Sequence, residues 1–105
     1  MNQVREKLKA GRVSYGVWIE VMSVELVEVC GDLGYDFAVL DAEHQTLNAM
    51  ACFELVRACQ LSGIAPMVRV PSDDPSVIRG LAPAEVMRPA PSSRVNVMPS
   101  NNRAR

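Results

Sequence analysis

The sequence has little of what several classes of protein depend on. Its 105 residues include five aromatic side chains and one histidine, and the formal net charge is −1. With so few aromatics and so little charge, neither nucleic acid nor an anionic membrane surface is an expected partner. No apolar run approaches the roughly 18 residues of a membrane span, and the polar first residues lack the apolar core of a signal peptide. We therefore expect a cytoplasmic protein.

The three cysteines, Cys30, Cys52 and Cys59, are too few for a disulfide framework and contain no C-x-x-C pair. On one helix, Cys52 and Cys59 would lie about two turns, roughly 10 Å, apart, which is too far for a disulfide. We expect all three to be buried as small apolar side chains in a reducing compartment. Glycine-rich phosphate loops, clustered zinc ligands and nucleophile elbows are also missing from the sequence.

Composition divides the chain near residue 80. Residues 1–79 carry a net charge of −4, whereas residues 80–105 carry +3 and hold four of the seven prolines. The second part shows no sustained apolar periodicity, so we expect an extended or disordered tail over 82–105. The first part, 1–81, has the mixture of apolar and charged residues of one modest globular domain.

Short apolar runs alternate with helical periodicity in this first part. Helices are expected at 4–10, 24–33, 49–61 and 75–81, and strands at 13–21, 37–40 and 66–70. Helix starts are marked by the N-cap residues Ser23, Asn48 and Asp74, and helix ends by Gly11, Gly34 and Gly63. Strand centres 22 and 29 residues apart fit parallel strands joined by crossover helices. The expected fold class is α/β with parallel βα units, in an open sheet or in part of a barrel.

Polar residues cluster where the expected strands end. In parallel α/β folds the loops after the strands carry function, and this rule selects Trp18, the segment 41–44 and Arg69. His44, the only histidine, is close in sequence to Asp41 and Glu43, and a neighbouring carboxylate raises the basicity of an imidazole. His44 is therefore either a general base or a histidine on a surface loop.

Arg69 stands inside an apolar strand, where a guanidinium group is costly unless it has a partner. That partner is either the carboxylate of a ligand, held by two hydrogen bonds, or an internal salt bridge to Asp41 or Glu43. The two carboxylates could contribute to binding a hard cation, but they supply too few oxygens for an octahedral site by themselves.

Several stretches resemble one enzyme family in their order and spacing. They are 8–11, 16–18, 34–37, 40–44 and 67–71. Together they resemble the N-terminal part of the HpcH/HpaI aldolase/citrate lyase family over about residues 5 to 81. The most specific part is the pattern G-x-D-F-x-x-x-D-x-E-H, followed about 25 residues later by V-R-V-P.

The resemblance implies a fragment of a (β/α)₈ TIM barrel, since a complete barrel needs roughly 200 residues or more. It implies a homo-oligomeric class II pyruvate aldolase, in which Mg²⁺ or Mn²⁺ binds a small 2-oxo acid. The reaction is retro-aldol cleavage of a 4-hydroxy-2-oxo acid to pyruvate, or an analogue, and an aldehyde. By the same resemblance His44 is the catalytic base and Arg69 stabilises oxyanion charge. Trp18 belongs to the substrate pocket, and Asp41 and Glu43 orient the base or the water shell of the metal.

The sequence departs from the family pattern at Val24, where proline is usual, and at Gln45, where glycine is common. After Leu81, Ala82 and Pro83 replace a Leu-Asp-x-Gly stretch. The metal-binding carboxylates of the family belong to later strands that this sequence does not contain. We therefore expect a truncated or frameshifted aldehyde-lyase that is inactive by itself. The alternative is a non-catalytic barrel fragment that self-associates or binds a partner through open sheet edges.

Overall fold

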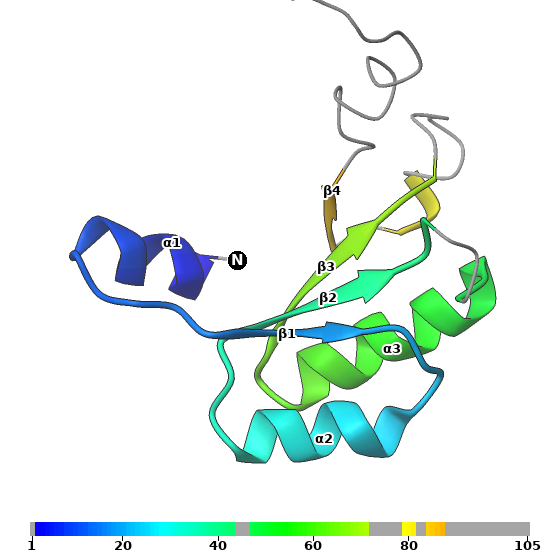
Figure 1. Ribbon diagram of the computed structural model, residues 1–105, viewed down its shortest axis with the longest axis horizontal. Helices are drawn as coiled ribbons and strands as arrows, with labels where there is room; N and C mark the ends of the chain where they lie inside the picture. The colour runs from blue at the N-terminus through cyan, green and yellow to red at the C-terminus, as the bar shows by residue number, and fades with distance from the viewer. Residues whose placement is uncertain (1, 44–46, 72–78, 82–83, 88–105) are drawn as a thin grey trace, which may run out of the picture.

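The computed structural model describes residues 2–43, 47–71, 79–81 and 84–87 (Figure 1). Its elements are α1 (Asn2–Lys9), β1 (Gly16–Ile19), α2 (Val24–Asp32), β2 (Phe37–Asp41), α3 (Ala49–Leu61), β3 (Ala65–Arg69) and β4 (Glu85–Met87). None of the described helices is long and apolar enough to cross a membrane. The alternation of strands and helices after α1 confirms the α/β class.

The four strands form one parallel sheet in the order β1-β2-β3-β4. Each strand therefore pairs with the strand that follows it along the chain. The connecting helices α2 and α3 lie on the same side of the sheet (Figure 1). This repeated placement is that of consecutive βα units in a barrel, and it confirms the expected parallel βα architecture.

The two crossover helices begin at the residues that the sequence marks as N-caps. The Ser23 hydroxyl accepts a hydrogen bond from the Leu26 N–H at 3.1 Å, and the Asn48 amide oxygen accepts one from the Ala51 N–H at 2.9 Å. Each bond satisfies an N–H group that has no partner within its own helix. After α2, Gly34 takes a φ of 88°, which glycine adopts without a steric penalty.

Alternation of side chains along the strands gives the sheet two different faces. On the helix side Ile19, Leu40 and Val68 are buried against Val27 of α2 and Leu55 of α3. The hydrophobic core therefore lies between the sheet and its two helices. The opposite face carries the polar residues at the strand ends, and no described helix covers it at that end.

Helix α1 lies near the amino-terminal ends of the strands (Figure 1). Its Lys7 ammonium group is 2.6 Å from a carboxylate oxygen of Asp36, just before β2, and Arg5 is 3.1 Å from Glu85 at the start of β4. Val4 is buried. These contacts fix α1 at the end of the sheet that is remote from the polar strand ends.

The three cysteines are free thiols, and all three are buried. Cys30 lies on α2, whereas Cys52 and Cys59 lie on α3, and all belong to the hydrophobic core. This placement confirms that they serve as small apolar side chains.

Strand β4 corrects one expectation, because it falls within the segment predicted to be a tail. Glu85–Met87 pairs with β3, and the N–H of Val70 donates to the carbonyl of Met87 at 3.0 Å. The count of three strands was therefore too low. A strand of three residues is too short to show the alternation by which strands are recognised.

The fourth expected helix lies mostly outside the described residues. Of that segment, Arg79 and Gly80 are helical and Leu81 is buried in the core. The rest of the segment predicted as a tail, apart from 84–87, also lies outside the described residues.

Candidate functional site

The polar residues at the strand ends meet on the sheet face opposite the helices. Asp41 ends β2 and Arg69 ends β3, and the two are paired positions in the register of these strands. Trp18, on β1, lies opposite Val39, two residues before Asp41 on the same face. Since parallel strands end at the same edge of a sheet, their side chains converge there.

Asp41 is the centre of the cluster. Its side chain accepts hydrogen bonds from Arg69 Nε at 3.2 Å and Arg69 Nη2 at 2.8 Å, one on each oxygen. Trp18 Nε1 donates to Oδ2 at 3.0 Å, and the backbone N–H of Glu43 donates to Oδ1 at 3.0 Å. Asp41 is only 1% exposed. These four bonds compensate the cost of burying its charge.

Arg69 is held by more than Asp41. Its Nε lies 2.9 Å from a carboxylate oxygen of Glu43, and its Cζ lies 5.0 Å from the centre of the Trp18 ring. The ring distance is that of a cation–π contact. The side chain of Arg69 remains 24% exposed. Of the two partners expected for this arginine, the structure therefore shows the internal salt bridge, with both carboxylates taking part.

The charges of the cluster reinforce one another. Burial raises the pKa of Asp41, but the hydrogen bonds from Arg69, Trp18 and the Glu43 backbone outweigh burial and bring it to about 2. The hydrogen bond to Asp41 raises the pKa of Arg69 in spite of burial, and the charges of Asp41, Glu43 and Glu20 add to this rise. At neutral pH the cluster is therefore an ionised pair with one further carboxylate beside it.

The described part of the cluster does not fit a divalent metal. Within the described ranges, no group of three or more His, Cys, Asp or Glu side chains could hold a metal ion. Asp41 and Glu43 direct carboxylate oxygens to Arg69, and a bound arginine competes with a cation for those oxygens. His44, the expected base, lies outside the described residues.

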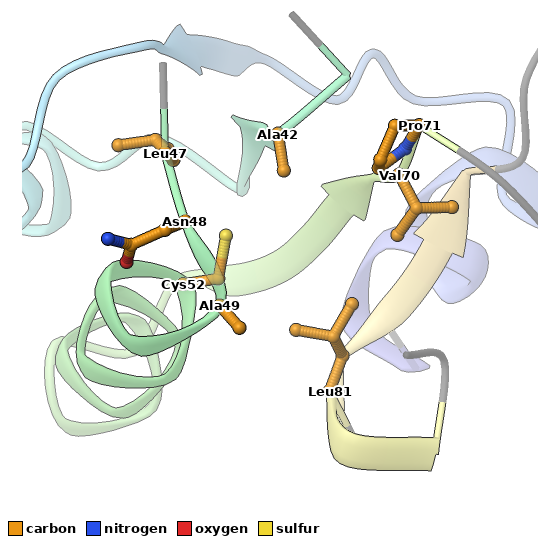
Figure 2. Close-up of a pocket in the computed structure, with 8 residues that line it drawn as sticks. All are labelled: Ala42, Leu47, Asn48, Ala49, Cys52, Val70, Pro71 and Leu81. Carbon is orange, nitrogen blue, oxygen red and sulfur yellow. The ribbon is translucent and has the colours of Figure 1, made fainter. Parts of the chain in front are cut away.

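A pocket that the sequence did not predict lies between the ends of β2 and β3 and the start of α3 (Figure 2). Its volume is about 310 Å³. Its lining residues are uncharged and mostly apolar: Ala42, Leu47, Asn48, Ala49, Cys52, Val70, Pro71 and Leu81. The pocket had no sequence signal, because it arises only where side chains from four separate segments meet in the fold.

Comparison with known sequences finds aldolases among the relatives of this chain. The chain is 35% identical over 78 residues to the 5-keto-4-deoxy-D-glucarate aldolase of Salmonella newport strain SL254. The same enzyme of Salmonella gallinarum matches equally well. The match covers 74% of this chain but only 30% of the relative, so the chain spans less than a third of the length of these curated relatives. No family model matches the sequence.

Comparison with solved structures also finds aldolases among the proteins that this chain resembles. The citrate synthase SbnG has a TM-score of 0.73 at 28% identity, over 90% of this chain and 40% of the neighbour. The HpcH/HpaI aldolase from Desulfitobacterium hafniense DCB-2 has a TM-score of 0.66 at 25% identity, over 74% and 30%. These neighbours are TIM-barrel proteins that the chain matches in part. By sequence and by fold the chain is similar to the N-terminal part of the TIM barrel of HpcH/HpaI aldolase/citrate lyase family proteins.

Proposed function

We propose that Trp18, Asp41, Glu43 and Arg69 form the anion-binding part of an aldehyde-lyase site. The ligand is a small 2-oxo acid, and the reaction is retro-aldol cleavage of a 4-hydroxy-2-oxo acid to pyruvate, or an analogue, and an aldehyde. The way in which Arg69 is held carries the proposal. Its Nε and Nη2 contact Asp41 and Glu43, while the side chain remains 24% exposed, so an anion can reach the guanidinium.

The chemistry of the cleavage needs a fixed positive charge. A base removes the proton of the C4 hydroxyl, and the C3–C4 bond breaks as the aldehyde carbonyl forms. The bonding electrons move toward the C2 carbonyl, so negative charge collects on its oxygen until C3 is protonated. A guanidinium already oriented toward that oxygen stabilises the charge without reorganising. Arg69 suits this task because Asp41, Glu43 and Trp18 fix its position.

The remaining roles follow from the family. We assign the base to His44, which directly follows Glu43 in the motif of the family. Asp41 and Glu43 are assigned the orientation of Arg69, since both contact it. The divalent metal, Mg²⁺ or Mn²⁺ in the resemblance, finds no ligand set among the described residues, so no part in holding it is assigned to them.

Binding of pyruvate tests the anion-binding role. Trp18 is the only tryptophan, so the intrinsic fluorescence of the chain reports on the cluster. We expect pyruvate to change this fluorescence saturably in the wild-type chain and not in Arg69→Ala. Arg57→Ala, an exposed arginine of α3, is the matched control and should bind as the wild type does. Equal pyruvate affinity in Arg69→Ala and wild type would contradict the proposal.

Turnover is a separate measurement. We expect the 105-residue chain, supplied with Mg²⁺ or Mn²⁺ and a 4-hydroxy-2-oxo acid, to release no pyruvate above background, because in the resemblance the metal-binding carboxylates belong to later strands. Release of pyruvate that is lost in His44→Ala would show instead that the chain is an active lyase, and would overturn the expected inactivity.

A non-catalytic, self-associating fragment is the second candidate. Strand β1 pairs only with β2 among the described strands, so its other edge is open. The exposed apolar residues on α2 or next to either end of it are Val21, Leu26, Val29 and Leu33. Open edges and exposed apolar side chains favour association. Sedimentation velocity decides: concentration-dependent oligomers without pyruvate binding favour this candidate, and a monomer that binds pyruvate excludes it.

A further inference from the structure

We propose that Trp18 is a positioning residue, which fixes Asp41 and through it the orientation of Arg69. The effect of Trp18 on ligand binding rests on the proposed function. Its effect on the placement of Asp41 and Arg69 does not depend on that function. The resemblance to the family places Trp18 in the substrate pocket. The contacts of the indole assign it a different task, which is to hold the Asp41–Arg69 ion pair in one arrangement.

The first observation is that one side chain contacts both members of the pair. The Nε1–H of Trp18 donates to Asp41 Oδ2 at 3.0 Å, while the face of its ring lies 5.0 Å from Arg69 Cζ. The edge of the indole thus contacts the anion, and its face contacts the cation. Because the indole is rigid and planar, these two contacts fix the relative placement of the carboxylate and the guanidinium.

The second observation concerns the direction of the indole. In the strand register Trp18 lies opposite Val39, yet its nitrogen bonds to Asp41, two residues further along β2. The side chain therefore leans toward the carboxyl end of the sheet. Two residues before Trp18, toward the start of the strands, the ring of Phe37 lies over Gly16. A Cβ on Gly16 would be 2.1 Å from that ring.

The third observation is that burial does not explain this arrangement. Trp18 is 48% exposed, and it is not part of the hydrophobic core. A half-exposed indole has water available for its N–H and gains little from apolar contact where it stands. Its hydrogen bond instead reaches a carboxylate that is nearly inaccessible to water. The polar contact is therefore what holds the ring in place.

These contacts explain how Arg69 keeps one orientation. Asp41 Oδ2 accepts from both Trp18 and Arg69 Nη2, so the indole bond limits rotation of the carboxylate about its own axis. The carboxylate in turn holds the guanidinium in its plane through two parallel bonds. Loss of the indole bond removes one restraint on this rotation while both charged groups remain present.

The test compares Trp18→Phe and Trp18→Leu with wild type. Phenylalanine keeps a ring for stacking but has no N–H, and leucine lacks both. Tyr35→Phe, which changes an aromatic residue outside the cluster, is the matched control. The readout is the Nε–H signal of Arg69 in ¹H–¹⁵N NMR spectra of the ligand-free chain, with far-UV circular dichroism as a check on folding. This measurement does not require the chain to bind or to turn over any substrate.

In wild type we expect an Arg69 Nε–H signal that exchanges slowly near neutral pH and whose chemical shift changes when Asp41 is protonated. In Trp18→Phe the exchange near neutral pH should quicken, and the change of chemical shift should occur at a higher pH, because Asp41 has lost a donor to its ionised form. Trp18→Leu should show a larger change in the same direction. Unchanged exchange and an unchanged pH of the shift change in both variants, with folding intact, would overturn the positioning role.

Pyruvate affinity at neutral pH separates this inference from the proposed function. We expect Trp18→Phe to bind pyruvate several-fold more weakly than wild type does. Isothermal titration calorimetry measures the two affinities. If wild type binds no pyruvate while the Nε–H signal still responds to Trp18→Phe, the positioning role holds and the anion-binding function fails. If wild type binds pyruvate and Trp18→Phe changes neither the signal nor the affinity, the positioning role fails and the function stands.

Discussion

Asp41 and Arg69 occupy paired positions at the ends of β2 and β3, and their side chains are joined by two hydrogen bonds of 3.2 and 2.8 Å. The pair combines a buried carboxylate with an arginine that is still a quarter exposed. The carboxylate is thus inaccessible to solvent, whereas part of the guanidinium side chain can be reached from solvent. The proposed anion-binding role of Arg69 requires this asymmetry.

Replacing Asp41 should destabilise the chain. Asp41→Asn keeps the shape of the side chain but leaves Arg69, among its contacts with described residues, with the carboxylate of Glu43 alone. We expect a loss of about 2 to 3 kcal/mol in the free energy of unfolding at neutral pH, because Arg69 loses the charge of its buried partner. The loss is smaller than for a fully buried ion pair, because Arg69 is partly exposed and can recover some hydration. Urea denaturation measures it. Glu43→Gln, at a more exposed position, is the control and should cost less; an equal cost would contradict the central place of Asp41.

The stability of the chain should fall with pH in a defined window. The pKa of Asp41 is lowered from 3.8 to about 2. A group whose pKa is lower in the folded state stabilises that state above its ordinary pKa, and the stabilisation is lost as the pH falls from about 4 to about 2. The contribution of Asp41 is about 2 kcal/mol.

The difference between wild type and Asp41→Asn isolates this effect, because the pKa of Asp36 is also lowered, first of all by its hydrogen bond with Lys7. We expect the difference in unfolding free energy to narrow between pH 5 and pH 2. Asp36→Asn serves as the control. Introducing it into both proteins should leave the difference in unfolding free energy between wild type and Asp41→Asn unchanged. A constant difference across this range would mean that Asp41 is not the titrating group.

The thiols of α3 should resist alkylation in the folded chain. Burial raises the pKa of Cys52, and burial together with the neighbouring Cys30 raises the pKa of Cys59 to about 11. Since the thiolate is the reactive form, iodoacetamide should label both cysteines slowly near neutral pH and quickly in urea. Mass spectrometry of the labelled protein gives the rates. Rapid labelling of Cys59 under native conditions would contradict its burial.

The N-cap of α3 should contribute measurably to stability. Asn48→Ala removes the oxygen that accepts from the Ala51 N–H, and we expect a loss of about 1 kcal/mol in unfolding free energy. Asn48→Asp keeps an acceptor at that position and should restore most of the loss. If alanine and aspartate behave alike in urea denaturation, the cap does not contribute as the structure suggests.

The sequence predicted most of the fold because its signals are local. The caps at Ser23 and Asn48 and the apolar run before Asp41 act within a few residues, and the structure confirms them. Strand β4 escaped prediction because its three residues become a strand only by pairing with β3. No run of such length carries its own signal.

The candidate site was predictable as a set of residues but not as an arrangement. The rule that parallel strands end at one edge selects Trp18, Asp41 and Arg69 from sequence alone. It does not say whether Arg69 faces a ligand or an internal carboxylate, since that depends on the distances between side chains. The bridging position of the indole depends on the same distances, and the function of His44 remains a prediction.

The most direct measurement is a titration of the wild-type chain with pyruvate, followed in ¹⁵N NMR spectra of the arginine side chains. We expect the guanidinium signals of Arg69 to shift saturably, while those of Arg57, on the exposed side of α3, stay in place. Such a result would establish that the arginine held by Asp41 also receives the anion. Signals of Arg69 that do not move at saturating pyruvate, in a chain shown to be folded, would contradict the account.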